Sequence, residues 1–146
     1  MNKIAAIILL FSSFCFGQQN QEVEKPIHNL FLAMKNADPE LLKTVFAENA
    51  ILQTITKEGT VKTDSIQDFV TSVSRFAKGD LEEKIVVEAI HRDGNLASVF
   101  TPYSFYLKGV FSHCGANSFQ LVKQNNEWKI QYIIDTRRKD KCREIK

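Results

Sequence analysis

The residues with the strongest potential for chemistry lie on three consecutive segments in the C-terminal half of the chain. Asp135 interrupts an otherwise apolar segment, and Tyr103 and His113 lie on the two segments before it. A carboxylate, an imidazole and a phenol are groups that general acid–base catalysis uses. Arg137 and Arg138 follow Asp135 closely, and a guanidinium can hold an anionic group of a substrate. This set predicts acid–base chemistry on a small molecule.

The sequence leaves a catalytic and a structural interpretation of these residues open. In the catalytic one, His113 is a general acid or base, Asp135 orients it or acts as the base itself, and Tyr103 donates a hydrogen bond. In the structural one, Asp135 and Arg137 form an ion pair at the rim of a sheet, and His113 is an ordinary strand residue. Trp128 is expected in the core and is also a candidate for substrate contact.

Turn signals indicate how these segments meet. Asp93-Gly94 is typical of a two-residue hairpin turn, and Lys108-Gly109 and Asn125-Asn126 are weaker versions of it. The three turns predict four antiparallel strands, at about 82–92, 95–107, 110–123 and 127–137. Several exceed the usual ~5–6 residues, so we expect a long and strongly curved sheet.

Counting back from these turns gives a predicted register. The predicted cross-strand pairs are His113 with Ser104, Cys114 with Tyr103, Asp135 with Ala116, and Arg137 with Cys114. Since cross-strand neighbours and diagonals lie roughly 4.5–8 Å apart, the candidate side chains should be able to touch. A one-residue bulge, for which Gly115 is a candidate position, would change which face each side chain occupies.

Apolar residues before residue 80 recur at helical spacing. A first helix is predicted from about Glu24 or Lys25 to Asn36, because Pro26 fits only the first turn. Asp38-Pro39 starts a short second helix, and residues 50–56 form a strand. Asp64 starts a third helix, which ends by Gly79. Helices on one face of a sheet predict an α+β domain with a concave cavity, a usual place for a small-molecule site.

This arrangement resembles the nuclear transport factor 2-like (NTF2-like, or SnoaL-like) superfamily. The resemblance rests on the Asn36-Ala37-Asp38-Pro39 junction, on the order of elements, and on the last hairpin, SFQLVKQNNEWKIQYIIDTRR. More narrowly, HCGANSFQLVK followed by WKIQYIIDTRR and a late cysteine resembles exported bacterial members without an assigned reaction. The resemblance implies a cone-shaped fold, with three N-terminal helices packed on a strongly curved antiparallel sheet, a pocket, and commonly dimerisation through the outer sheet face.

Residues 1–17, MNKIAAIILLFSSFCFG, have the layout of a secretory signal peptide, with Lys3 before an apolar run and small residues before a cut at Gln18. A hydrophobic N-terminal strand, an uncleaved anchor or a lipoprotein anchored at Cys15 are the alternatives. Cleavage leaves an NTF2-like domain at 18–146, with no membrane span, in the periplasm or outside the cell. Its remaining cysteines, Cys114 and Cys142, form a disulfide or stay two separate thiols.

Composition excludes several classes of protein. The chain has 146 residues, 44% of them hydrophobic and 25% charged, with a net charge of +2, so it is one folded domain with no case for nucleic acid as its partner. His28, His91 and His113 lack metal-ligand spacing, and no phosphate loop or cofactor fingerprint is present. We therefore expect no metal and no cofactor. Residues 137–146 hold six basic and two acidic residues, which suit a solvated end or an anion-binding tail.

Three functions remain as hypotheses. The first is an exported, homodimeric protein that binds a small, partly apolar molecule. The second is an acid–base enzyme of isomerase, dehydratase or cyclase type that uses Asp135 and His113. The third is a non-catalytic module for dimerisation or protein interaction.

Overall fold

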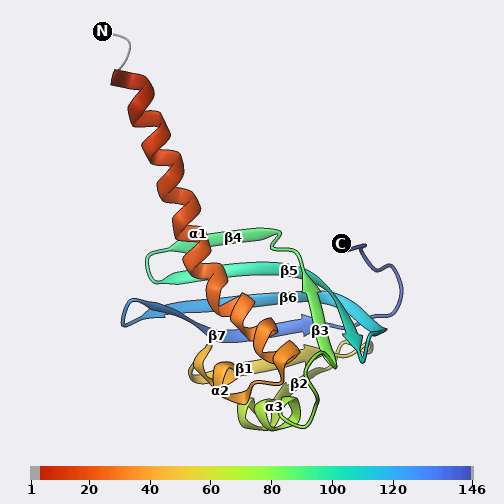
Figure 1. Ribbon diagram of the computed structural model, residues 1–146. Helices are drawn as coiled ribbons and strands as arrows, with labels where there is room; N and C mark the ends of the chain where they lie inside the picture. The colour runs from red at the N-terminus through yellow and green to blue at the C-terminus, as the bar shows by residue number, and fades with distance from the viewer. Residues whose placement is uncertain (1–3, 146) are drawn as a thin grey trace.

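The computed structural model describes residues 4–145, with side chains from residue 20 onward. Within that range the chain forms three helices and seven strands (Figure 1). The helices are α1 (Ile4–Asn36), α2 (Pro39–Thr44) and α3 (Ile66–Val73). The strands are β1 (Phe46–Ile55), β2 (Val61–Asp64), β3 (Leu81–Ile85), β4 (Ala89–Asp93), β5 (Leu96–Leu107), β6 (Val110–Gln124) and β7 (Glu127–Thr136).

The strands form one curved sheet in the order β2-β1-β7-β6-β5-β3, with β4 also paired to β5. The segment of α1 after residue 20 crosses one face of this sheet, and α2 and α3 lie toward the edge formed by β2 and β1 (Figure 1). The sheet is mixed, because β1 pairs with β7 in parallel. The prediction of a wholly antiparallel sheet is therefore wrong, since no hairpin turn joins β1 to β7 and imposes an antiparallel direction.

The first helix begins earlier than predicted, since α1 is continuous through Pro26. Val23 and Ile27, on either side of that proline, are both fully buried against the sheet. Their burial offsets the roughly 3 kcal/mol cost of an interior proline. Of the predicted signal peptide, residues 1–3 and the side chains of the rest lie outside the described residues. No described helix is long and apolar enough to span a membrane.

The second helix begins as predicted. The Asp38 carboxylate accepts hydrogen bonds from the backbone N–H groups of Glu40 and Leu41, at 3.1 and 3.0 Å. The third helix is capped by Ser65 rather than Asp64, because Asp64 ends β2, a strand that the sequence pattern did not predict.

The predicted strand 82–92 is broken into β3 and β4, both of which pair with β5. The break falls opposite Pro102, which lacks the N–H that a continuous ladder requires there. Instead, the backbone N–H of Val86 donates to the Pro102 carbonyl, and that of Glu88 donates to the Phe100 carbonyl, both at 3.0 Å.

Two one-residue bulges correct the predicted register. Ser112 is unpaired in β6 and Gln131 is unpaired in β7, so every pair beyond them moves by one residue. The observed pairs are His113 with Phe105, Cys114 with Ser104, Gly115 with Tyr103, Asp135 with Asn117, and Arg138 with Cys114. The four predicted pairs are therefore wrong, and Gly115 is not the bulge.

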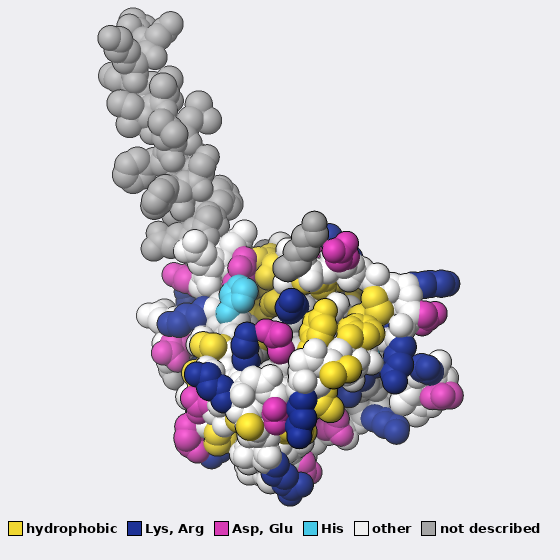
Figure 2. Space-filling model, turned by 45° about the vertical axis from the view of Figure 1, so that its right-hand side comes forward, with side chains coloured by type: hydrophobic (Ala, Val, Ile, Leu, Met, Phe, Trp, Pro, Cys, Tyr) yellow, Lys and Arg dark blue, Asp and Glu magenta, His cyan; other side chains and the backbone are white. Residues whose placement is uncertain are grey.

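The core lies between the sheet and the helices. Phe119, Leu121 and Ile130 of the sheet are fully buried, and Phe31 of α1 packs edge-on against Phe119 with ring centroids 6.3 Å apart. On the face of the molecule shown in Figure 2, basic and acidic side chains are interspersed, with apolar side chains between them. That face therefore carries no large field of one sign.

Candidate functional site

A cavity of about 420 Å³ lies between α3, β3 and the inner side of β5, β6 and β7. Its apolar lining consists of Met34, Phe69, Val73, Phe76, Leu81 and Phe105. Its polar lining consists of Asp64, Asp68, Ser72, Glu83, Tyr103, His113, Asp135 and Arg137. The structure thus brings four of the sequence-predicted candidates, Tyr103, His113, Asp135 and Arg137, into one cavity.

Asp135 is the most buried carboxylate of the cavity. Its Oδ2 accepts a hydrogen bond from Arg137 Nε at 2.9 Å, and the Tyr103 hydroxyl lies 3.2 Å from the same oxygen. Its Oδ1 is buried and has no hydrogen-bond partner within the described part of the chain. A buried carboxylate oxygen without a partner is costly. It marks a position where a donor from another molecule would be stabilised.

Tyr103 is held by burial and by two acceptors. Its hydroxyl lies 2.9 Å from the backbone carbonyl of Thr136 as well as 3.2 Å from Asp135, and its single proton can serve one of them at a time. Burial, followed by the negative charge of Asp135, raises the pKa of Tyr103, so the phenol stays protonated. Tyr103 is therefore a hydrogen-bond donor in this cavity.

Gly115, between Tyr103 and β7, makes this contact possible. A Cβ atom at this position would lie 1.8 Å from the Thr136 carbonyl oxygen and 2.8 Å from Cε1 of Tyr103. Only glycine permits such a close approach of backbone and ring.

Glu83 is the cavity residue that the sequence analysis missed. It accepts a hydrogen bond from Asn117 Nδ2 at 2.9 Å, and the same Asn117 amide lies 3.3 Å from the Thr101 hydroxyl. Burial raises the pKa of Glu83 to about 7; the charge of Asp135 adds to the rise, while Asn117 and Arg137 oppose it. A carboxyl with such a pKa can give or take a proton near neutral pH.

A sequence signal for Glu83 did exist. Leu81, Ile85 and Val87 recur at spacing two and indicate the inner face of a strand, on which Glu83 is the one polar interruption. Its neighbour Glu82 points the other way and accepts from Lys35 Nζ at 2.6 Å.

His113 lines the cavity mainly as an aromatic ring. Its ring centroid lies 5.7 Å from that of Tyr103 and 5.0 Å from that of Phe105. Its Nδ1 lies 3.0 Å from the Ser112 hydroxyl, and no hydrogen bond joins it to Asp135 among the described residues. Burial, followed by the positive charge of Arg137, lowers the pKa of His113, so the ring is neutral at pH 7.

Trp128 does not belong to this cavity. It lies seven residues before Asp135 on the same strand, which is roughly 23 Å along it. It is 5% exposed in the core and borders a different hollow, and Arg92 lies over its ring at 5.1 Å. Trp128 is therefore in the core, as expected, but apart from Asp135, because inward-facing residues of a ten-residue strand reach opposite ends of the sheet; its contact with a substrate stays a prediction.

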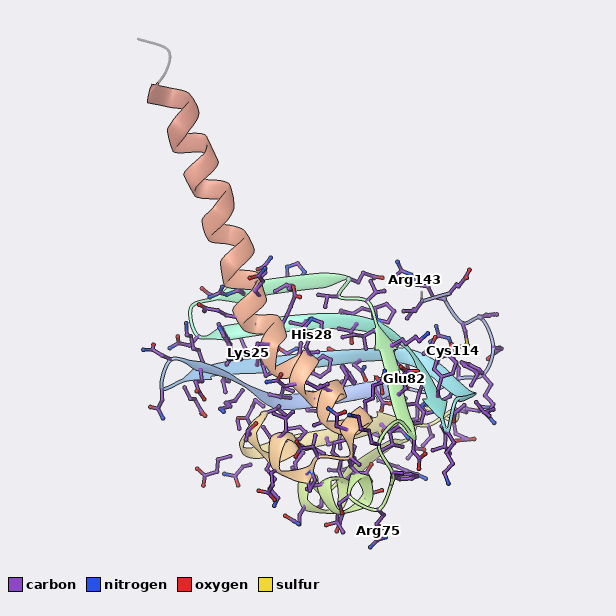
Figure 3. The ribbon with its side chains drawn as sticks, viewed as in Figure 1. Lys25, His28, Arg75, Glu82, Cys114 and Arg143 are labelled. Carbon is purple, nitrogen blue, oxygen red and sulfur yellow. A yellow bond between two sulfur atoms is a disulfide. The ribbon has the colours of Figure 1, made fainter. Side chains whose placement is uncertain are left out.

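The C-terminal segment folds back over the other face of the sheet at the cavity end. Cys114 and Cys142 form a disulfide, with sulfur atoms 2.12 Å apart, and Arg143 pairs with Glu88 (Figure 3). Ile145 is buried beyond them. Cys114 faces away from the cavity, as its neighbour His113 faces into it.

Metal-ligating side chains do not cluster in the described part of the chain, where no group of three or more His, Cys, Asp or Glu residues could hold an ion. His28 on α1 is exposed and lies 3.4 Å from Glu24 (Figure 3).

The sequence and the fold were compared with those of known proteins. The sequence model of the family described as "Putative lumazine-binding" matches residues 18–132. No curated protein matches the sequence.

Solved structures share the fold at low sequence identity. An NTF2-like protein of unknown function from Shewanella baltica is 15% identical, with a TM-score of 0.68 over 84% of this chain and 96% of its own. A protein of unknown function with a cystatin-like fold from Nostoc punctiforme is 11% identical, with a TM-score of 0.66 over 83% and 92%. A "putative ketosteroid isomerase" from Shewanella frigidimarina is 14% identical, with a TM-score of 0.60 over 78% and 94%.

Proposed function

Because the chain belongs to the "Putative lumazine-binding" family and to the NTF2-like superfamily, we propose that it binds a small, partly apolar molecule in the cavity beside Asp135. The observation that carries this proposal is the unpartnered Oδ1 of Asp135 within a cavity that has both apolar and polar walls. Apolar walls with a few polar groups that fix orientation are typical of small-molecule sites.

The polar groups of the cavity determine which pattern of donors and acceptors a ligand must present. Asp135 Oδ1 accepts a hydrogen bond, and Arg137 and a protonated Glu83 donate. A flat heterocycle with adjacent N–H and carbonyl groups matches this combination, and lumazine, a pteridinedione, has such an edge. Phe69, Phe76 and Phe105 supply apolar surface for its rings.

Titration of the purified protein with lumazine, followed by the fluorescence of the ring, tests this function. Asp135→Asn should weaken binding at least tenfold, because the amide replaces one acceptor oxygen by a donor. Asp93→Asn is the matched control, since Asp93 lies in an exposed hairpin turn that asparagine also accepts. Equal binding by both variants, or no binding by the wild type, would contradict the proposal.

Acid–base catalysis is a second candidate function, and Glu83 favours it. A carboxyl with a pKa of about 7, next to Asp135 and a donating Tyr103, can move a proton beside a carbonyl group. Hydrogen–deuterium exchange of the α-protons of cyclohexanone in D2O, followed by proton NMR, tests this candidate. Exchange should be faster with the wild type and with Glu82→Gln than with Glu83→Gln.

We also propose that the chain is exported and cleaved before Gln18. Two features support export: the layout of residues 1–17 and the Cys114–Cys142 disulfide, which persists in oxidising compartments. The intact mass of the protein from its own host, measured with and without alkylation of free thiols, tests the cleavage before Gln18 and the disulfide. A mass that includes residues 1–17, or two alkylated cysteines, would contradict export.

A further inference from the structure

We propose that the mouth of the cavity binds a phosphate group of the ligand, while the flat part of that ligand fills the inner cavity. This inference rests on the proposed binding function and adds the chemical class of the ligand. It concerns a second hollow, of about 510 Å³, that adjoins the first.

The two hollows adjoin at three shared residues. Asp64, His113 and Arg137 line both of them. A ligand that is held against Asp135 and extends past His113 and Arg137 would enter the outer hollow. We call that outer hollow the basic mouth.

The basic mouth has an excess of positive charge. Five of its lining residues are basic, namely Lys57, Lys62, Arg137, Arg138 and Lys139, and one, Asp64, is acidic. Exposed Glu58 adds a second carboxylate near two of the lysines. Two carboxylates against five cations leave the mouth positive.

Of these five cations, Arg137 is already paired, because its Nε donates to Asp135 at 2.9 Å. By contrast, no carboxylate lies within 4.0 Å of the side-chain nitrogens of Lys57, Lys62 or Lys139 in the part of the chain that is described. The Arg138 guanidinium donates to a backbone carbonyl, that of Lys141, at 3.4 Å. The anion-binding charge thus comes from four residues around the mouth rather than from Arg137.

These four cations come from two segments that the fold brings together. Lys57 and Lys62 flank the turn between β1 and β2, and Arg138 and Lys139 follow β7, which pairs with β1. Thr54, Thr56 and Ser112 also line the mouth. Lysine and arginine side chains suit a phosphate dianion, which can contact more than one cation at once.

Riboflavin and flavin mononucleotide are matched probes for this inference. They share one flat ring system with an N–H and carbonyl edge, and they differ by a single phosphate. We expect the mononucleotide to bind at least tenfold more tightly than riboflavin, with inorganic phosphate competing against the mononucleotide alone. The variant Lys57→Gln/Lys62→Gln/Lys139→Gln keeps only Arg138 of the four cations, so it should remove most of that difference and leave riboflavin binding unchanged.

A control variant distinguishes the effect of the charges in the basic mouth from that of the net charge of the protein. Lys43→Gln/Lys78→Gln/Lys84→Gln removes the same charge away from both hollows and should preserve the tenfold difference. Equal binding of the two flavins by the wild type would overturn the phosphate site and leave the ring site standing. Lysine-dependent binding of inorganic phosphate without binding of either flavin would support the mouth and overturn the proposed ring site. No binding of the mononucleotide or of phosphate would overturn the inference.

Discussion

Tyr103 reaches across β6 to Asp135, with its hydroxyl 3.2 Å from Oδ2, although the two residues lie on strands that do not pair with each other. Gly115, directly opposite Tyr103, leaves the space through which the phenol passes. The absence of one side chain therefore permits the contact of Tyr103 with Asp135.

Gly115→Ala should destabilise the protein by about 3 kcal/mol, because the added Cβ meets the Thr136 carbonyl oxygen and strands β6 and β7 must separate. Urea unfolding followed by tryptophan fluorescence measures the change. Ser118→Ala, on the same strand, is the control and should change stability by less than about 0.5 kcal/mol. An unchanged unfolding midpoint for Gly115→Ala would refute the argument from close approach.

Glu83 should make the protein less stable as the pH rises. Its pKa is about 7 in the folded state, against an ordinary 4.5, so the folded state holds this proton more tightly than the unfolded state. The contribution of Glu83 to the free energy of unfolding is complete below about pH 4.5 and is lost as the pH rises through 7. Because glutamine resembles the protonated acid, Glu83→Gln should gain up to about 3 kcal/mol at pH 8 and little at pH 4.5. Urea midpoints at the two pH values measure this difference.

Glu82→Gln is the control for that experiment. Glu82 lies one residue away, and its pKa is lowered by the hydrogen bond from Lys35. Its replacement should lower stability slightly at pH 8 rather than raise it. If both variants changed stability in the same way, burial of Glu83 would not be the cause of the pH-dependent gain.

The convergence of the candidate residues could be predicted from sequence, but their exact register could not. Hairpin turns bring Tyr103, His113 and Asp135 to the same end of the sheet within a residue or two. The bulges at Ser112 and Gln131 then move every later pair. Neither position has the glycine that often marks a bulge, so local sequence gives no warning.

Long-range pairing explains the other differences. The parallel contact of β1 with β7 joins segments about 80 residues apart, and no turn in the sequence specifies it. Likewise, Glu83 could be recognised on an apolar face, but its neighbours Asn117 and Asp135 come from strands reached much later in the chain. The basic mouth depends on the same parallel contact. Local patterns therefore predicted most of the elements, and tertiary pairing determined the arrangement of the site.

We predict that the protein dimerises through the outer face of the sheet. Phe100 faces outward between the buried Val99 and Thr101, and it is 41% exposed. Phe100→Glu should convert a dimer to a monomer in sedimentation velocity, because a charge replaces apolar contact surface. Phe111→Glu is a matched control, since Phe111 is also 41% exposed but lies near the β5–β6 turn. A wild-type monomer, or equal dissociation by both variants, would contradict this prediction.

The Cys114–Cys142 disulfide should hold the C-terminal segment on the sheet. The bond joins residues 28 apart in sequence, and closing a loop of that size stabilises a protein by about 2–4 kcal/mol. Reduction with dithiothreitol should lower the unfolding free energy by that amount. It should also speed amide exchange in residues 138–145, because the exposed Arg143–Glu88 ion pair stabilises little and only the buried Ile145 side chain then holds the segment. Cys142→Ser should reproduce both effects and make the protein insensitive to dithiothreitol. If the unfolding midpoint of the wild type were the same before and after reduction, the C-terminal segment would stay on the sheet without the disulfide.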